Sequence, residues 1–184
     1  MAHVCPWWLG YLLINPIRRV LSHPSKIVGP YVKPGMTVVD VGCAMGFFSL
    51  WMASEVGDDG RVVCVDVQER MIAALKRRAA KAGVLDRIDP RVCGTDSLGL
   101  DDLSGRADFV LAFHVAHEVP DIASLMKQIH AVLKRGGKFL LAEPRGHVKR
   151  WQFAKTVALA TDAGFEELDS RRLVRSWSAL LRPV

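Results

Sequence analysis

Apolar residues along most of the chain occur in two alternating patterns. Short runs rich in β-branched residues, each about as long as a buried strand, alternate with longer stretches whose apolar residues recur at helical spacing. Buried strands are predicted at Thr37–Val41, Arg61–Val65, Ile88–Cys93, Ala107–Phe113 and Lys138–Glu143. Helices are predicted at Phe47–Val56, Gln68–Ala82, Ile122–Leu133 and Trp151–Ala163. This alternation is typical of an α/β domain in which helices cover both faces of a parallel sheet.

The two ends of the chain depart from this alternation. Residues 1–35 combine a Trp-rich apolar stretch with several prolines, which divide it into short pieces. We therefore expect an N-terminal helical cap or lid over residues 1–35 and a main domain over residues 36–184. At the other end, Glu166–Leu173 and Ser176–Leu181 predict a terminal hairpin added to the edge of the sheet.

Composition and charge narrow the class of protein. Half of the 184 residues are hydrophobic and 24% are charged, which disfavours a disordered chain or a coiled coil. The formal net charge of +6 suggests an acidic partner such as RNA or anionic lipid. Much of the basic charge lies in short helical stretches, however, where a solvated helix face is the simpler interpretation. Nucleic acid is therefore disfavoured as a partner.

Cysteine spacing and the apolar N-terminal stretch bear on location. The 4 cysteines lie far apart, with neither the spacing of a zinc site nor the density of a disulfide scaffold. The apolar stretch Val4–Ile14 lacks the basic start and the cleavage site of a signal peptide. It is also shorter than the ~20 apolar residues that a spanning helix requires. We expect a reduced, cytoplasmic protein with no transmembrane segment.

The first predicted strand leads through a glycine-containing turn into a helix. Gly42 and Gly46 allow a tight turn and a close approach of backbone to a ligand, at the place where open α/β sheets bind ligands. Their spacing differs from the G-x-G-x-x-G pattern of dinucleotide sites, which counts against NAD. Asp66 ends the second strand, where a carboxylate can accept both ribose hydroxyls. Asp40 and Asp96 are expected at the same edge of the sheet, although capping of a helix or turn explains each of them equally well.

Five segments resemble, in order and spacing, the successive motifs of Rossmann-like, class I S-adenosylmethionine-dependent methyltransferases. They are Asp40-x-Gly42-x-x-x-Gly46, Val63-Cys64-Val65-Asp66, Gly94-Thr95-Asp96, Asp108–Phe113 and Leu133–Leu140. The resemblance covers about residues 28–145 and is closest to the small-molecule methyltransferases of ubiquinone and menaquinone biosynthesis. It implies a doubly wound, mostly parallel seven-stranded sheet with an antiparallel C-terminal strand at Ser176–Leu181.

The resemblance also implies S-adenosylmethionine as the cofactor and S-adenosylhomocysteine as the product. In this family the glycines of the first motif pass under the methionine portion, and the residue matching Asp66 holds the ribose. Val67 would lie against the adenine ring, and Asp96 would bond the adenine amino group. The chain departs from the family at Cys43 and Ala44, where glycine is frequent. The cofactor-binding residues expected here are Asp40, Gly42, Cys43, Ala44, Gly46, Asp66, Val67, Asp96, Ser97 and Phe113.

Cys43 also admits a chemical interpretation. It is expected beside the cofactor turn at the start of a helix, where the helix dipole lowers the pKa of a thiol and would make it reactive. The simpler interpretation is a small residue in place of glycine.

Histidines gather where the fourth and fifth strands end. Methyl transfer is an in-line displacement, so the protein chiefly supplies alignment, exclusion of water and a base. His114, His117 and His147 are the candidates for that base. His114 and His117 would share a helical face if the turn after Phe113 were helical. A metal site or ordinary hydrogen bonding would use the same histidines, and no metal ligands are assigned.

The acceptor is expected to be a small, largely apolar molecule. Trp7, Trp8, Tyr11 and Glu143 are predicted to line its pocket, although the Trp-rich segment is also explained by packing or by a homodimer contact. The chain lacks the Asn/Asp-Pro-Pro-aromatic clamp of enzymes that methylate base amino groups. Rival hypotheses are an NAD-dependent oxidoreductase, or a protein that binds S-adenosylmethionine or RNA without catalysis.

Overall fold

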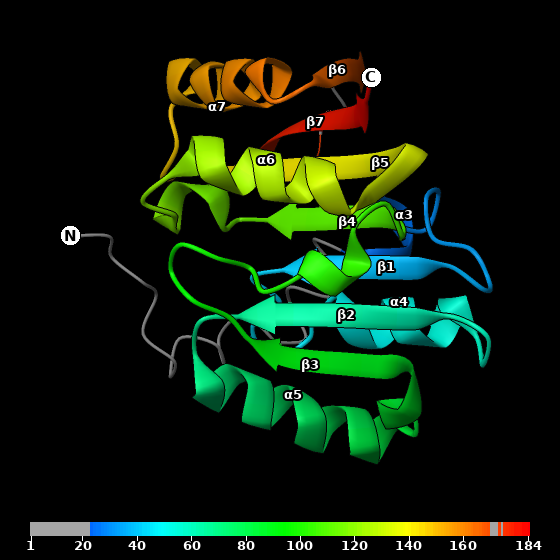
Figure 1. Ribbon diagram of the computed structural model, residues 1–184. Coiled ribbons are helices and arrows are strands. Elements are labelled where there is room, and N and C mark those ends of the chain that lie inside the picture. Colours follow the sequence, from blue (N-terminus) through cyan, green and yellow to red (C-terminus); the bar gives the residue numbers. More distant parts are fainter. Residues whose placement is uncertain (1–22, 170–172, 174) are drawn as a thin grey trace. The chain divides into compact units, whose positions relative to one another are not determined.

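The computed structural model describes residues 23–169, 173 and 175–184. Three short 3-10 helices occupy Leu85–Arg87, Asp101–Leu103 and Ala116–Glu118. The other elements, drawn in Figure 1, are α3 (Pro24–Ile27), β1 (Thr37–Val41), α4 (Ser49–Val56), β2 (Arg61–Asp66), α5 (Glu69–Ala82), β3 (Ile88–Val92), β4 (Ala107–Phe113), α6 (Ile122–Val132), β5 (Leu133–Pro144), α7 (Arg150–Asp162), β6 (Phe165–Asp169) and β7 (Ser176–Pro183).

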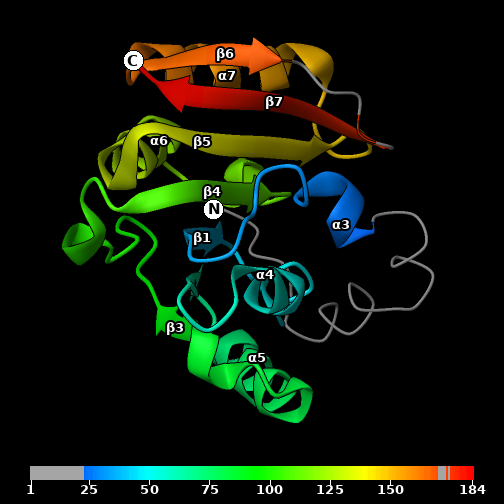
Figure 2. The same ribbon diagram turned by 90° about the vertical axis from the view of Figure 1, so that its right-hand side faces the viewer.

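The strands form a seven-stranded sheet in the order β3-β2-β1-β4-β5-β7-β6. β2 pairs in parallel with β1 and β3, and β4 pairs in parallel with β5. β7 is antiparallel to both of its neighbours, β5 and β6, and the three strands lie side by side in Figure 2. The predicted mostly parallel sheet and the predicted terminal hairpin are therefore confirmed.

The described chain divides into two compact units, which we call the first unit (residues 23–93) and the second unit (residues 94–184). In the first unit, Val38 and Val39 of β1 and Val62 and Val63 of β2 have no exposed surface. Such uninterrupted apolar runs are typical of parallel strands that are covered on both faces. α4 packs against β2, and α5 packs against β3. These contacts fix the carboxyl ends of β1 and β2, from which the candidate cofactor residues extend.

Helix α5 follows the sequence pattern that predicted it. It turns Met71, Ile72 and Leu75 toward the core and leaves its basic side chains exposed, except for the half-buried Arg78, which donates to the Met45 carbonyl oxygen. Gly83 ends the helix in the left-handed conformation, with φ of 69°, and its N–H donates to the Ala80 carbonyl oxygen at 3.1 Å. This is the favoured way to satisfy the last carbonyls of a helix.

In the second unit, helices α6 and α7 pack against each other and lie side by side in Figure 1. Asp121 begins α6 by accepting a hydrogen bond from the Ser124 backbone N–H at 2.9 Å, as helix-capping residues do. Phe139 of β5 and Phe165 of β6 are both buried, with ring centroids 5.5 Å apart. The core of this unit therefore joins the central strands to the terminal hairpin.

Several element boundaries differ from the predicted ones, among them the starts of β5 and α4. β5 begins at Leu133 instead of Lys138, because Leu133 already pairs with Ala107 of β4 directly after α6 ends. The pairing then shifts register between Ala107 and Phe109 before the regular ladder resumes. α4 begins at Ser49 instead of Phe47. The residues before it form a longer turn than the hydrophobic pattern indicates.

The predicted cap falls largely outside the described residues. Of residues 1–35, the structure describes the short helix α3 and the segment from it to β1. Trp7, Trp8 and Tyr11, with the homodimer contact considered for this arm, lie outside the described part. The cap therefore stays a prediction. In the described ranges, every helix is too short or too polar to cross a membrane.

Candidate functional site

The glycine turn of the first unit connects β1 to α4. Gly42 and Gly46 have φ of 69° and 78°, values that L side chains rarely adopt. The backbone N–H groups of Gly42 and Cys43 both donate to the Val65 carbonyl oxygen, at 2.9 and 3.1 Å. The turn is therefore fixed against the end of β2, directly beside Asp66.

Gly46 has a second reason to be glycine. A Cβ atom at this position would lie 2.2 Å from Leu75 Cδ1 and 2.6 Å from Leu50 Cδ1. The sequence suggested that Gly46 leaves room for a ligand, whereas its missing side chain leaves room for leucines of α4 and α5. Within the cofactor motif, Gly46 therefore also allows α4 and α5 to pack against the turn.

Asp66 is buried and is held by the backbone of two loops. Its Oδ2 accepts from the Ala44 N–H, and its Oδ1 accepts from the Gln68 N–H, both at 2.9 Å. Burial raises the pKa of this carboxyl group, while the two N–H donors lower it. A carboxylate oxygen can accept two hydrogen bonds, so each oxygen of Asp66 can accept one more, from a hydroxyl donor. The next residue, Val67, is 39% exposed and presents an apolar surface.

These features fit S-adenosylmethionine. A carboxylate at the end of β2 can accept from ribose hydroxyls, and an exposed valine beside it can cover an apolar ring face. The acceptor oxygens and the apolar surface that the resemblance assigns to Asp66 and Val67 are thus both present. Their binding of the cofactor stays a prediction, because their geometry alone does not test it.

Asp40 turns inward and joins β1 to the start of α4. Its Oδ2 accepts from Ser49 Oγ at 2.5 Å, and the side chain is 3% exposed. Burial raises the pKa of Asp40 to about 7, and the neighbouring Asp66 charge adds to this rise. Bonds from Ser49, the first residue of α4, match the helix-capping interpretation of Asp40. Asp40 therefore shapes the turn from the inside.

Cys43 is buried, and the reactive-thiol interpretation is wrong. Burial raises the pKa of the Cys43 thiol well above its ordinary value, and the nearby Cys64 side chain adds to this. The helix dipole was expected to lower that pKa, but loss of water around the sulfur has the larger effect. Cys43 is thus a small buried residue of the turn.

Asp96 and Ser97 belong to an exposed loop at the start of the second unit. The Gln128 side chain of α6 holds this loop through both ends of its amide. Its Oε1 accepts from the Leu98 N–H at 2.8 Å, and its Nε2 donates to the Asp96 carbonyl oxygen at 3.0 Å. The sequence does not indicate the role of Gln128, because a single polar residue in an amphipathic helix does not show which loop its side chain will contact. Gln128 fixes the backbone from which the Asp96 side chain projects.

Replacing Gln128 with alanine is expected to weaken S-adenosylhomocysteine binding about tenfold, the effect of losing one or two hydrogen bonds that hold the loop. If Asp96 recognises the adenine amino group, the preference for S-adenosylhomocysteine over S-inosylhomocysteine should shrink as well, because inosine lacks that group. Calorimetry with both ligands measures this ratio. Lys127→Ala, an exposed neighbour on the same helix, is the control. An unchanged ratio in Gln128→Ala would contradict the role given to Gln128.

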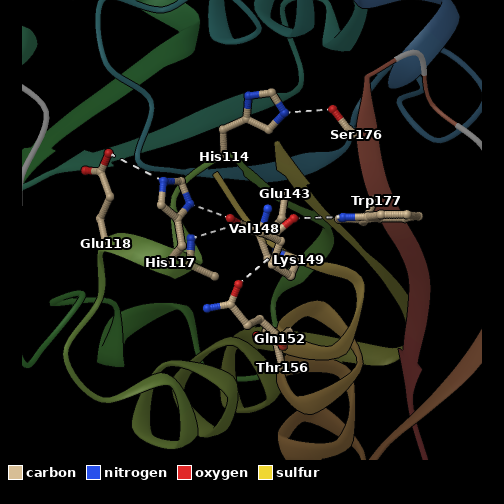
Figure 3. Close-up of polar contacts among 11 residues, drawn as sticks. His114, His117, Glu118, Glu143, Val148, Lys149, Gln152, Thr156, Ser176 and Trp177 are labelled. Atoms are coloured by element: carbon tan, nitrogen blue, oxygen red, sulfur yellow. Dashed lines mark hydrogen bonds and ion pairs between the residues drawn. The ribbon is translucent and has the colours of Figure 1, made fainter. Parts of the chain in front are cut away.

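The second unit contains a buried acid paired with a histidine, shown in Figure 3. Glu143, at the end of β5, is 1% exposed. Its Oε1 accepts from the Ala116 N–H at 2.9 Å, and its Oε2 bonds His117 Nδ1. The hydrogen bond that His117 donates to Glu143 raises the pKa of His117, and burial lowers it. The negative charges of Glu143 and Glu118 raise this pKa further. Glu143 therefore orients a histidine with its carboxylate, and its place in the acceptor pocket stays a prediction.

His114 has a different partner from His117. Its Nε2 lies 2.8 Å from Ser176 Oγ (Figure 3), and its ring stacks on Phe113 with centroids 4.2 Å apart. His114 has φ of 62°, whereas His117 belongs to the separate 3-10 helix Ala116–Glu118. The prediction that the two histidines share a helical face is therefore wrong. The left-handed backbone conformation of His114 does not fit a right-handed helix that would contain both residues.

His147 lies near His117 but forms no close pair with it. Their ring centroids are 6.2 Å apart, and the His147 residue is exposed on the turn that follows β5. Within residues 23–169, 173 and 175–184, no three His, Cys, Asp or Glu side chains are arranged to hold a metal ion. Of the three predicted base candidates, the structure thus gives His117 a buried carboxylate partner.

Comparison with known proteins assigns the family. A family model described as a methyltransferase domain matches residues 32–178. A demethylmenaquinone methyltransferase of Symbiobacterium thermophilum is 30% identical over 121 residues, which are 66% of this chain and 47% of that protein. The ubiquinone/menaquinone biosynthesis C-methyltransferase UbiE of Brucella suis is 28% identical over 116 residues, which are 63% of this chain and 42% of that protein. The chain belongs to the class I S-adenosylmethionine-dependent methyltransferase family.

Solved structures share the fold. A SAM dependent methyltransferase from Aquifex aeolicus aligns with a TM-score of 0.87 at 20% identity and covers 98% of this chain and 100% of that one. The [4+2]-cyclase SpnF aligns with a TM-score of 0.69 at 22% identity and covers 84% of this chain and 60% of that one. The match spans less than half the length of the two curated relatives. The fold is therefore shared more widely than any one reaction.

Proposed function

We propose that this protein transfers a methyl group from S-adenosylmethionine to a small-molecule acceptor, with His117 as the base and Glu143 as the residue that positions it. Beside the family membership, one observation supports this most. A carboxylate that is 1% exposed is bonded to the ring of a histidine whose side chain is 27% exposed. A buried acid behind a partly exposed histidine is the usual arrangement for a general base.

Most of the residues that this proposal assigns to the cofactor belong to the first unit. When bound, S-adenosylmethionine supplies a methyl group on a positively charged sulfur, which makes the methyl carbon open to displacement. Asp66 accepts from the ribose hydroxyls, and Val67 covers one face of the adenine ring. Asp96, on the loop that Gln128 holds, accepts from the adenine amino group.

His117 takes the proton that the acceptor loses. With its Nδ1–H donated to Glu143, the neutral ring keeps its lone pair at Nε2, the atom that faces away from the acid. A proton then moves from the acceptor to Nε2 as the acceptor atom bonds the methyl carbon. The ring becomes a cation, which the Glu143 carboxylate and the nearby Glu118 stabilise.

The acceptor class follows from the family pattern and not from the fold. The relatives' names include demethylmenaquinone and ubiquinone/menaquinone biosynthesis, which makes phenolic or quinol rings the first molecules to try. The apolar Trp7, Trp8 and Tyr11 would suit such rings if residues 1–35 close over them. A reaction in the cytoplasm, and acceptors other than nucleic acid, stay predictions of the sequence.

The test combines binding with turnover on the full chain. Calorimetry with S-adenosylmethionine, S-adenosylhomocysteine and NAD is expected to show micromolar binding of the first two and none of NAD. Methyl-labelled S-adenosylmethionine is then incubated with phenols, hydroquinones and thiols, and label in the organic product is counted. Binding of NAD alone would overturn the proposal in favour of an oxidoreductase. Tight S-adenosylmethionine binding without transfer to any acceptor would favour a non-catalytic binding protein.

A further inference from the structure

Arg145 is held in one orientation by two neighbours in the second unit. Its guanidinium carbon lies 4.4 Å from the ring centroid of Trp177, and its Nε donates to the Ser176 carbonyl oxygen at 3.1 Å. The Trp177 indole is fixed in turn, because its Nε1 donates to the Val148 carbonyl oxygen at 3.0 Å (Figure 3). No residue in the described ranges accepts from the terminal Nη groups of Arg145. The structure thus presents a fixed guanidinium with donors to spare.

The segment around Arg145 has charge of one sign. From Pro144 to Thr161 the sequence contains no Asp or Glu, and its basic residues are Arg145, His147, Lys149, Arg150 and Lys155. All five are exposed. A planar guanidinium among positive neighbours attracts oxyanions and matches the geometry of a carboxylate or phosphate. Because stacking already limits its motion, Arg145 loses little side-chain freedom when it binds one.

Two residues with strained backbone conformations also contact Arg145 or its neighbour Ser176. His114 and Arg175 have φ of 62° and 63°, in the left-handed region that favours glycine. His114 Nε2 lies 2.8 Å from Ser176 Oγ, and the Arg175 carbonyl oxygen accepts from the Arg145 N–H at 3.0 Å. Strained non-glycine residues persist where surrounding contacts enforce them, and they cluster at ligand sites. Both strained residues here contact the Arg145–Ser176 pair.

We infer that Arg145 binds a carboxylate or phosphate group carried by the methyl acceptor. The inference rests on the proposed function in naming the acceptor as the carrier of that group. His147 follows Arg145 by two residues, and its ring centroid is 6.2 Å from that of His117. The turn that contains Arg145 therefore also carries a histidine whose ring lies near the base His117. The acceptor class narrows from small molecules in general to small oxyanions.

The first test needs no turnover. Benzoate and inorganic phosphate are titrated separately into the 15N-labelled full chain, while the Arg145 Nε–H and Trp177 indole N–H signals are followed by NMR at constant ionic strength. We expect saturable shifts at millimolar concentrations with one or both anions, and the anion with the lower Kd identifies the chemical source. Arg145→Gln is expected to weaken that binding about tenfold to a hundredfold. Arg145→Lys should lose most of it, because a point charge lacks the planar fork.

Controls separate this site from general charge and from folding. Lys155→Gln removes one positive charge from the same basic segment without touching Arg145, and it is expected to bind both anions as the wild type does. Thermal unfolding of Arg145→Lys shows whether the stacked arrangement survives. No saturable shift in the wild type, or equal affinity in Arg145→Gln, would overturn the inference whatever the outcome for methyl transfer.

A second test uses turnover and distinguishes the two proposals. Hydroxybenzoates are compared with their amides as acceptors of labelled methyl groups. The wild type is expected to prefer the acid about tenfold or more in kcat/KM, and in Arg145→Gln the ratio of acid to amide kcat/KM should fall to about one. If both acceptors fall equally in Arg145→Gln, Arg145 is only structural. If amides react as well as acids in the wild type, the anion site fails and the proposed function stands.

Discussion

Replacing Asp66 with asparagine is expected to weaken the binding of S-adenosylmethionine and S-adenosylhomocysteine by about a hundredfold or more. Two hydrogen bonds from ribose hydroxyls to a charged carboxylate contribute about 1.5–3 kcal/mol each, and asparagine keeps only one acceptor oxygen. Loss of one of these bonds, and weakening of the other by about 1 kcal/mol because its acceptor is no longer charged, correspond to about two to three powers of ten in Kd. Calorimetry of both variants under the same conditions measures it.

The stability of this variant separates a binding role from a structural one. Burial raises the pKa of Asp66, so the carboxylate is less favourable in the folded protein than in water. Asparagine removes that charge, but one of the backbone N–H groups of Ala44 and Gln68 then loses its acceptor, so the free energy of unfolding is expected to fall by about 1–3 kcal/mol. Asp86→Asn, an exposed acid of the same unit, is the control for a lost charge. Undiminished cofactor binding by Asp66→Asn would refute the assignment of Asp66 to the ribose.

Replacing His117 with alanine is expected to lower kcat for methyl transfer about a hundredfold to ten-thousandfold, the usual contribution of a general base. The Kd for S-adenosylmethionine should not change, because His117 has no part in the cofactor residues of the first unit. His114→Ala and His147→Ala test the other candidates, and His23→Ala is an exposed control in the first unit. Transfer at the wild-type rate by His117→Ala would leave catalysis to alignment alone.

The pH profile of methyl transfer shows in which direction Glu143 shifts the pKa of His117. The hydrogen bond from Glu143 raises the pKa of His117 above 6.5, and a base must be neutral to accept a proton. Activity is therefore expected to rise with pH through that raised pKa. Glu143→Gln removes the charge that raises it, so the rising limb should move to lower pH while the plateau falls. A profile with an unmoved rising limb would rule out Glu143 as the positioning residue.

The His117–Glu143 pair also stabilises the fold, and this stabilisation decreases as pH rises. A histidine whose pKa is raised in the folded state stabilises the fold fully below the unfolded value of 6.5, and this contribution is lost as pH rises through the folded pKa. Glu143→Gln should thus lower the unfolding temperature more at pH 6 than at pH 9. Activity and this part of the stability therefore change in opposite directions with pH.

Local pattern was enough for the fold and for half of the site. The strands Thr37–Val41 and Ala107–Phe113 have the predicted bounds, because a run of apolar residues in a parallel sheet must be buried on both faces. Gly42, Gly46 and Asp66 are recognisable because their spacing within a strand–turn–helix unit has few alternatives. At Gly46 the structure adds a second reason for glycine, because a Cβ atom there would meet Leu50 and Leu75.

The acceptor side could not be read locally. His114 and His117 are three residues apart in sequence, yet one bonds Ser176 and the other bonds Glu143, both far along the chain. The pairing of β5 with β4 and β7 decides which side chains meet there. Cys43 makes the same point, because the burial that raises its pKa depends on its neighbours in space.

The sequence by itself determined the α/β fold, the family and the cofactor turn, since each depends on residues that are close in the chain and on periodic burial. Only the tertiary structure decided that His117 is the histidine held by a buried acid, that Gln128 holds the Asp96 loop, and that Arg145 is stacked on Trp177. The physical reason is the same for all three. Hydrogen bonds and stacking between distant residues depend on strand register and backbone direction, which hydrophobic periodicity does not encode.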